Sequence, residues 1–241
     1  MKVAHFDCSS GAGGDMILGA LLDAGLDLLH LKQELARLHL SHYDLQVKKV
    51  RRRGVTASHA VITVEEDHHH DRRFRDIKGI IDGSGLPRVV KDGSIRIFRR
   101  LAEVEAEVHD TCINGVHFHE VGAVDAIIDI VGAVVGLYEF GIQKITCSPI
   151  HVGSGTVRCA HGVLPVPAPA TARLIKDVPF YSTEVTGELL TPTGAAILTT
   201  VTSAYCAAPG MEVERTGYGA GQADLPIPNV LCLTMGRSTA A

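Results

Sequence analysis

The sequence predicts a mixed α/β (α+β) fold in which a mixed β-sheet packs against helices. Two observations support this class. Runs with the period-2 pattern of strands and runs with the 3.6-residue pattern of helices alternate irregularly along the chain, without an internal repeat. The 241 residues are 46% hydrophobic, which is enough for one sizeable core or two modest ones.

The N-terminal part begins with a strand and ends with a hairpin. Residues 2–7 (KVAHFD) have the pattern of a strand, and the Gly-rich residues 8–15 (CSSGAGGD) form a turn that opens a helix. Gly25 ends this helix, and a second helix at about 27–39 has leucines along one face. Two alternating runs within 43–66 flank Gly54 and predict a hairpin with a basic middle.

The rest of the chain alternates between the two patterns. Residues 65–73 are polar and predict a loop, which is also a possible boundary between subdomains. We expect helices at about 74–83, 87–109 (interrupted only by Gly93), 122–139 and 192–204, a further helix after the Pro-rich 164–170, and strands near 116–119, 144–152, 156–160, 211–217 and 229–235.

Composition excludes several classes of function. The net charge is −4, with no basic excess for nucleic acid, and aromatics are only 5% with no Trp. No run approaches the ~18 apolar residues of a membrane span, and the start lacks a basic segment followed by an apolar one. The six cysteines form no CxxC pair, which favours reduced thiols. We therefore expect a cytoplasmic protein that binds neither nucleic acid nor membranes.

The segment VHFHEVGAVDAIIDIVG (116–132) concentrates chemically active side chains. On a strand, His117 and His119 share a face, and on the following helix Asp125 and Asp129 stack at i, i+4. Two imidazoles and the carboxylate of Glu120 suit a borderline cation such as nickel, zinc or iron, with the aspartates as acceptors for the imidazole N–H groups or as ligands of a harder ion. The alternative is a strand with hydrogen-bonded histidines before a helix whose first turn favours Asp.

A second histidine group lies in the polar loop. His68, His69 and His70 stand between two aspartates in DHHHD (67–71). Histidine-rich tracts can hold transition metals, but an exposed loop would bind them weakly and exchangeably. This tract is therefore either a metal-delivery site or simply a solvated loop.

The Gly-rich stretch DCSSGAGGDM (7–16) is a candidate anion site. Backbone N–H groups at a helix start bind phosphate well, and glycines let the ligand approach. The stretch lacks a Walker or dinucleotide fingerprint, and Asp7 and Asp15 would repel a phosphate unless a cation intervened. The glycines alternatively serve only a tight turn.

Two later segments carry weaker signals. Cys159 and His161 lie two apart in a Gly/Pro-rich loop and could ligate a metal, although Cys159 alone is typical of a buried small side chain. In GELLTPTGAA (187–196), Thr191 or Thr193 is expected to cap a helix, and the hydroxyls and N–H groups there could hold an anion.

Together, several long segments in order resemble one family. They are FDCSSGAGGDMILGALLDAG, VHFHEVGAVDAIIDIVG, AHGVLPVPAPAT, ELLTPTGAA and ERTGYGAGQADLPIPNVL. The chain is similar to the nickel insertion proteins of nickel-pincer cofactor synthesis. The resemblance implies that residues 1–241 form a nickel-insertion domain and that the family's C-terminal CTP-binding part is absent. It also implies a metal chelatase that inserts nickel into pyridinium-3,5-bisthiocarboxylic acid mononucleotide, with CTP and manganese or magnesium as further requirements of the full-length family.

Residue roles follow as hypotheses. His117 and His119 would hold nickel, with His68, His69 and His70 as a delivery site, and Glu120, Asp125 or Asp129 would act as base. The substrate would contact Gly11, Gly13, Gly14 and Asp15, with His161 and Thr193 as further binding residues. Expected partners are the substrate, the C-terminal CTP-binding part, lactate racemase-type apoenzymes and further copies of the chain. The alternatives are a nickel store or metallochaperone and, more weakly, a metal-dependent hydrolase.

Overall fold

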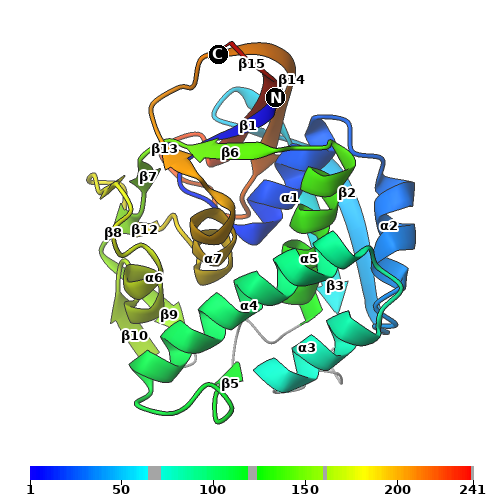
Figure 1. The fold of residues 1–241 in the computed structure, drawn as a ribbon. Helices are drawn as coiled ribbons and strands as arrows, with labels where there is room; N and C mark the ends of the chain where they lie inside the picture. Colours follow the sequence, from blue (N-terminus) through cyan, green and yellow to red (C-terminus); the bar gives the residue numbers. More distant parts are fainter. Residues whose placement is uncertain (65–71, 119–123, 160–161, 240–241) are drawn as a thin grey trace.

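The fold is built on a seven-stranded mixed sheet. The structure, a computed structural model, describes residues 1–64, 72–118, 124–159 and 162–239, and at residue 117 it describes only the backbone. The N- and C-terminal strands are neighbours in the middle of this sheet (Figure 1). In sheet order its strands are β13 (Ala204–Tyr205), β6 (Lys144–Cys147), β1 (Lys2–Asp7), β15 (Val230–Ser238), β14 (Met211–Ala220), β3 (Val55–Val64) and β2 (Tyr43–Arg52).

Strand directions make the sheet mixed, as predicted. β1 runs parallel to β6 and antiparallel to β15, with a register from Lys2 opposite Arg237 to Asp7 opposite Cys232. β14 runs antiparallel to β15 and parallel to β3, and β2 and β3 form the predicted hairpin around Gly54, which has φ +94°. The left-handed backbone at Gly54 explains why glycine stands at this turn.

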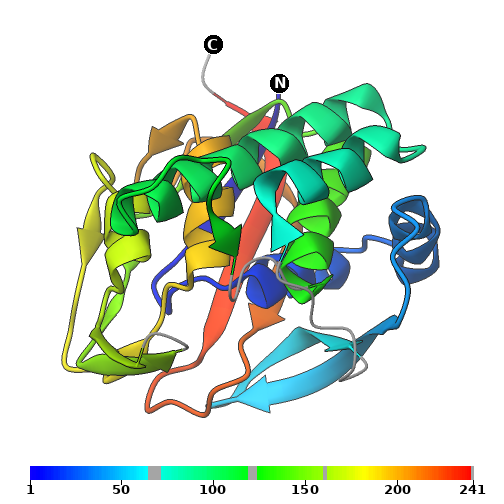
Figure 2. The same ribbon diagram turned by 90° about the horizontal axis from the view of Figure 1, so that it is seen from below.

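The helices pack against the sheet and against one another (Figures 1 and 2). Their bounds are α1 (Gly14–Asp23), α2 (Leu28–Ala36), α3 (Phe74–Gly83), α4 (Arg88–Val108), α5 (Val124–Glu139), α6 (Pro169–Leu174) and α7 (Pro192–Val201). α1 lies directly on β14 and β3, α5 packs on α1, and α4 crosses α5, α6 and α7. A side chain at Gly219 of β14 would collide with the Met16 carbonyl of α1, so glycine is what allows this close contact.

Two elements differ from their predicted form. α4 continues through Gly93 without a break. A Cβ at this position would lie 3.0 Å from Val134, so the missing side chain lets α5 approach α4. The strand predicted at 144–152 divides into β6 and β7. Four two-stranded ladders surround the main sheet: β4 (Arg72–Arg73) with β5 (His117–Phe118), β7 (Ile150–His151) with β11 (Phe180–Tyr181), β8 (Gly153–Ser154) with β12 (Gly187–Glu188), and β9 (Thr156–Cys159) with β10 (Gly162–Pro165).

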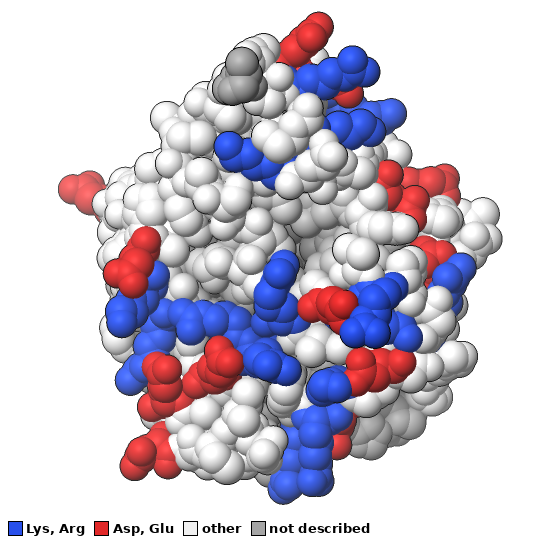
Figure 3. All heavy atoms as spheres, in the orientation of Figure 1, with Lys and Arg blue, Asp and Glu red and all other residues white. Residues whose placement is uncertain are grey.

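The surface carries both signs of charge. On the face formed by α3, α4 and α6, basic and acidic side chains are interspersed (Figure 3). Several of them pair, including Arg88 with Asp92 and Arg173 with Glu107. Among the described helices, none is long and apolar enough to cross a membrane.

Candidate functional site

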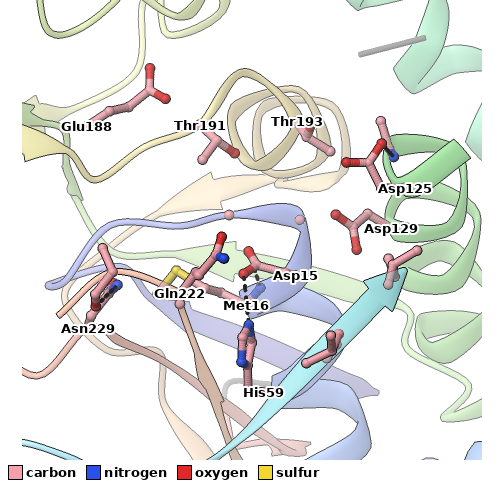
Figure 4. Close-up of a pocket in the computed structure, with 18 of the residues that line it drawn as sticks. Asp15, Met16, His59, Asp125, Asp129, Glu188, Thr191, Thr193, Gln222 and Asn229 are labelled. Atoms are coloured by element: carbon pink, nitrogen blue, oxygen red, sulfur yellow. Dashed lines mark hydrogen bonds and ion pairs between the residues drawn. The ribbon is translucent and has the colours of Figure 1, made fainter. Parts of the chain in front are cut away.

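A cavity of about 500 Å³ opens where three helices begin. The first turns of α1, α5 and α7 contribute to its wall, together with β3 and the loop at 221–229 (Figure 4). Its lining comprises Gly13, Gly14, Asp15, Met16, His59, Ala60, Val61, Ile62, Asp125, Ala126, Asp129, Glu188, Leu189, Thr191, Pro192, Thr193, Gly221, Gln222, Ala223 and Asn229.

The Gly-rich turn sets the start of α1 against two other segments. The Ala12 amide donates to the Leu189 carbonyl at 2.8 Å, and the Thr191 amide donates to the Ala12 carbonyl at 3.1 Å. These bonds hold the turn beside the start of α7. A Cβ at Gly14 would lie 2.5 Å from Asp129 Oδ2, so glycine is required for α5 to bring this carboxyl against α1. At the first turn of α1, the Met16 amide donates to Asp15 Oδ1 at 2.9 Å in place of a backbone carbonyl.

Thr191 is the N-cap of α7. Its Oγ1 accepts from the Gly194 amide at 3.1 Å, and Pro192 occupies the first turn. The sequence left Thr191 and Thr193 as equal candidates for this role. Since Thr191 takes it, the Thr193 hydroxyl lies beyond the cap and lines the cavity at the positive end of the helix dipole.

Asp125 and Asp129 both line the cavity, as their i, i+4 spacing predicted. Asp125 is exposed, and its Oδ1 accepts from the Ala126 amide at 2.8 Å. Asp129 is only 9% exposed, and its Oδ1 has no hydrogen-bond partner among the described residues. Burial raises the pKa of Asp129 well above its ordinary value, and the charges of Asp15 and Asp125 raise it further.

Asp15 completes a group of three carboxyls. Its Oδ1 accepts from the Met16 amide at 2.9 Å, which fixes the side chain at the start of α1. Burial raises the pKa of Asp15 to about 6, against the lowering effect of its amide hydrogen bonds, and the neighbouring Asp125 adds to the rise. The cavity therefore holds two carboxyls whose pKa values burial raises, beside the exposed Asp125.

His59 is the site residue that the sequence interpretation missed. Its Nε2 lies 3.8 Å from Asp15 Oδ2 across the cavity wall (Figure 4). Burial lowers the pKa of His59, and the positive charges of Arg52 and Lys48 lower it further, so the imidazole is neutral at pH 7. The available signal was that His59 is the only ionisable residue in the second hairpin strand, an apolar alternating run.

The basic middle of the hairpin donates hydrogen bonds to the loop at 221–229, which lines part of the cavity. Arg52 donates from Nε and Nη2 to the Gly221 carbonyl at 3.2 and 3.1 Å, and Arg53 Nε donates to the Leu225 carbonyl at 2.7 Å. Lys49 pairs with Asp23. Part of this run, expected to be a solvated face, thus anchors the loop at 221–229.

The structure brings most of the predicted substrate-binding residues together. Gly13, Gly14, Asp15 and Thr193 line the same cavity as the two aspartates of α5. Gly11 lies outside the lining: it has φ +84° and packs against the Leu189 backbone, where it shapes the turn. Other predicted residues fall outside the described part of the chain, namely Glu120, His119, His161, His68, His69 and His70, as does the side chain of His117.

The backbone relates the two histidine segments. β4 begins directly after residues 65–71, and β5 ends directly before 119–123. The two strands pair antiparallel, Arg72 opposite Phe118 and Arg73 opposite His117, so the chain enters β4 and leaves β5 at the same end of the ladder. Within the described ranges, no group of three His, Cys, Asp or Glu side chains is arranged to hold a metal ion.

Comparison with known proteins identifies the family of this chain. Residues 4–241 match the family described as "Nickel insertion protein". The chain is 53% identical over 237 residues to the "Pyridinium-3,5-bisthiocarboxylic acid mononucleotide nickel insertion protein" of Desulfitobacterium hafniense (strain DSM 10664 / DCB-2), which covers 98% of this chain and 59% of that protein. The protein of the same name from strain Y51 gives the same identity and coverage. The chain thus spans about three fifths of the length of these relatives. No solved structure matches. The chain belongs to the nickel insertion protein family.

Proposed function

We propose that this chain performs the metal-handling half of nickel insertion: it binds pyridinium-3,5-bisthiocarboxylic acid mononucleotide in the cavity and directs Ni²⁺ to its two sulfurs and the ring carbon between them. One observation carries the proposal. The cavity brings the start of α7, with Thr193, together with the carboxyls of Asp15, Asp125 and Asp129, and this substrate carries anionic groups and a cationic ring in one small molecule. Relatives named for this substrate support the choice of ligand.

The anionic groups of the substrate fit the threonine side of the cavity. At the first turn of α7, the Thr193 amide and hydroxyl can donate to a phosphate, and the helix dipole favours a negative charge there. We place the mononucleotide phosphate at this side.

The cationic ring fits the acidic side. Asp125 is exposed to the cavity, and Asp15 is ionised above pH about 6, so both can stabilise a pyridinium ring and a doubly charged metal. Burial raises the pKa of Asp129 well above its ordinary value, so this carboxyl favours its protonated form more than a free aspartate does. Asp15 and Asp125 would therefore supply most of the negative charge beside the ring and the metal.

Nickel delivery is assigned to the histidine segments. We propose that His117 and His119 hold nickel and that His68, His69 and His70 supply it, because imidazole suits nickel well. The antiparallel pairing of β4 with β5 supports this, since it joins the strand ends that lead to both segments. The residues before 65–71 belong to β3 and those after 119–123 belong to α5, and both elements line the cavity.

For the whole protein, we propose that turnover also needs the C-terminal part found in longer relatives. That part would supply binding of CTP with manganese or magnesium, and the finished cofactor would pass to lactate racemase-type apoenzymes in the cytoplasm. Both Desulfitobacterium hafniense relatives extend beyond the region that this chain matches. We also propose that copies of the chain associate.

A nickel titration with and without the bisthiocarboxylate mononucleotide tests the proposal. In the wild-type chain we expect the substrate to tighten nickel binding at least tenfold, because its sulfurs complete the coordination. A His117→Ala/His119→Ala variant should lose this gain, whereas a surface His30→Gln variant should keep it. Nickel binding that ignores the substrate and disappears with His68, His69 and His70 would instead identify a nickel store and refute the proposal.

A further inference from the structure

We propose that His59 is the base that accepts the ring proton when the nickel–carbon bond forms, and that Asp15 positions its imidazole. This inference rests on the proposed function and assigns a role to a residue outside the histidine segments. It starts from one contact: His59 Nε2 lies 3.8 Å from Asp15 Oδ2, and both side chains line the cavity.

The position of His59 is fixed by the sheet. It lies on β3, opposite Lys48 of β2, and its side chain is 16% exposed, so it is mostly removed from bulk water yet open to the cavity. Asp15 is held in turn by the Met16 amide at the start of α1. An imidazole oriented by a carboxylate that is itself anchored is the usual arrangement of a general base and its positioning group.

The charges around His59 favour the neutral imidazole. Lys48 and Arg52 lower its pKa, together with burial. Asp15 from α1 and, across the cavity, Asp125 and Asp129 from α5 are the acidic groups that face the same space. Beside these acidic groups, the pKa of His59 remains below its ordinary value. A neutral imidazole is ready to accept a proton at pH 7.

The carboxyls are less suited to this role. Asp129 is only 9% exposed and packs against Gly14 of α1, and burial raises its pKa well above the ordinary value. Asp125 is exposed, and its Oδ1 is bonded to the Ala126 amide. Asp15 points one oxygen at the Met16 amide and the other toward His59, which is the geometry of an orienting group. Among the described cavity residues, His59 is therefore the suitable neutral base.

The proposed step balances without an oxidant. Ni²⁺ first binds the two sulfurs of the substrate. The C–H bond between them then breaks, its electron pair becomes the nickel–carbon bond, and its proton passes to His59 Nδ1, because Nε2 faces the Asp15 carboxylate. The metal stays divalent. The imidazolium is stabilised by the Asp15 carboxylate and returns its proton to water when the product leaves.

The test compares His59→Gln with His30→Gln, the same change at a half-buried histidine of α2 that lies outside the cavity lining. Saturating nickel, substrate and CTP with manganese are mixed with the chain and with the C-terminal part of the Desulfitobacterium hafniense relative, and the nickel–carbon bond is followed by absorbance and mass spectrometry. We expect His59→Gln to bind substrate within about twofold of the wild type but to form the bond about 10²- to 10⁴-fold more slowly. His30→Gln should match the wild type in both measurements.

Two further readouts separate a base from a structural residue. Added imidazole should restore part of the rate of His59→Ala, and the acidic limb of the wild-type pH–rate profile should disappear in this variant. Asp15→Asn should shift that limb, because its carboxylate no longer stabilises the imidazolium. A His59→Gln chain that forms the bond at the wild-type rate, with the same pH profile, would overturn the role of His59 alone. A wild-type chain that holds substrate and nickel yet forms no such bond would overturn the proposed function, and this inference with it.

Discussion

At the scale of single residues, Asp129 lines the cavity although burying its carboxyl costs free energy. Its carboxyl is 9% exposed, and one oxygen lacks a partner within the described ranges. A buried carboxyl without a cation partner binds its proton more tightly in the folded protein than in the unfolded chain. The sequence could predict that Asp125 and Asp129 share a helix face. It could not predict the burial, because Asp129 is covered by α1, which is far away along the chain.

We therefore predict that Asp129→Asn is more stable than the wild type and that the difference grows as pH rises. The folded-state pKa is raised, so the proton contributes stability below the ordinary pKa near 4, and the wild type loses that contribution as pH increases through the folded-state pKa. Asn carries no such proton. The variant should match the wild type near pH 4 and gain about 1.4 kcal/mol per pH unit above it until the folded-state pKa is reached.

Urea unfolding from pH 4 to pH 8 measures this difference. The exposed Asp92, which pairs with Arg88 on the surface of α4, provides the control. Asp92→Asn should show no comparable gain with pH. A constant difference between Asp129→Asn and wild type across this range would contradict the buried, protonated state of Asp129.

Gly14 provides a second prediction at the residue scale. A Cβ there would lie 2.5 Å from Asp129 Oδ2 and 2.8 Å from its Cβ, so Gly14→Ala must push α5 away from α1. We expect a loss of about 1–3 kcal/mol in the free energy of unfolding, typical of overpacking, and weaker substrate binding. Gly79→Ala on α3 is the control, because nothing lies within 4 Å of its added methyl group. That change should instead stabilise by about 0.5–1 kcal/mol. Equal effects in the two variants would exclude the contact as the cause.

At the scale of elements, local signals were enough for the hairpin and most helices. Gly54 and the alternation around it predict β2 and β3, and the Thr191–Pro192 pair predicts the start of α7. The short strands β8 and β12 were not predicted, because each has two residues and depends on a partner distant in sequence. His59 was missed for the same reason: its neighbour Asp15 lies 44 positions away, on another element, so no spacing rule connects them.

The contact between the hairpin and the loop at 221–229 gives the prediction at this scale. Arg52→Met removes the hydrogen bonds to the Gly221 carbonyl, and bonds from charged donors contribute about 1.5–3 kcal/mol. We expect faster amide exchange at 221–229 and several-fold weaker substrate binding. Because Arg52 lowers the pKa of His59, the same variant should raise that pKa, which NMR of the imidazole can follow. Arg51→Met is the matched control, since Arg51 donates within the hairpin to the Gly54 carbonyl. Unchanged exchange in Arg52→Met would refute the anchoring role.

At the scale of the whole molecule, the cavity is assembled from distant parts of the chain. Its walls come from α1, β3, α5, α7 and the loop after β14. The main sheet likewise joins the two ends of the chain, because its first strand, β1, pairs with its last strand, β15. Sequence patterns identified most of these elements but not the strand order, because pairing between residues as distant as Lys2 and Arg237 leaves no local signal. Resemblance to a family supplied the substrate class, which periodicity and composition could not.

This assembly predicts that ligand binding slows local opening of several distant segments together rather than of one loop. A ligand that binds only the folded state adds about 2.7 kcal/mol at a concentration of 100 times its dissociation constant. Since the cavity joins the first turns of α1, α5 and α7, the substrate should raise the melting temperature and slow amide exchange in these turns together. The exposed α3, which contributes nothing to the lining, serves as the internal reference. Protection at the three helix starts without a change at α3 locates the substrate in this cavity, whereas protection confined to α3 and α4 would place it elsewhere.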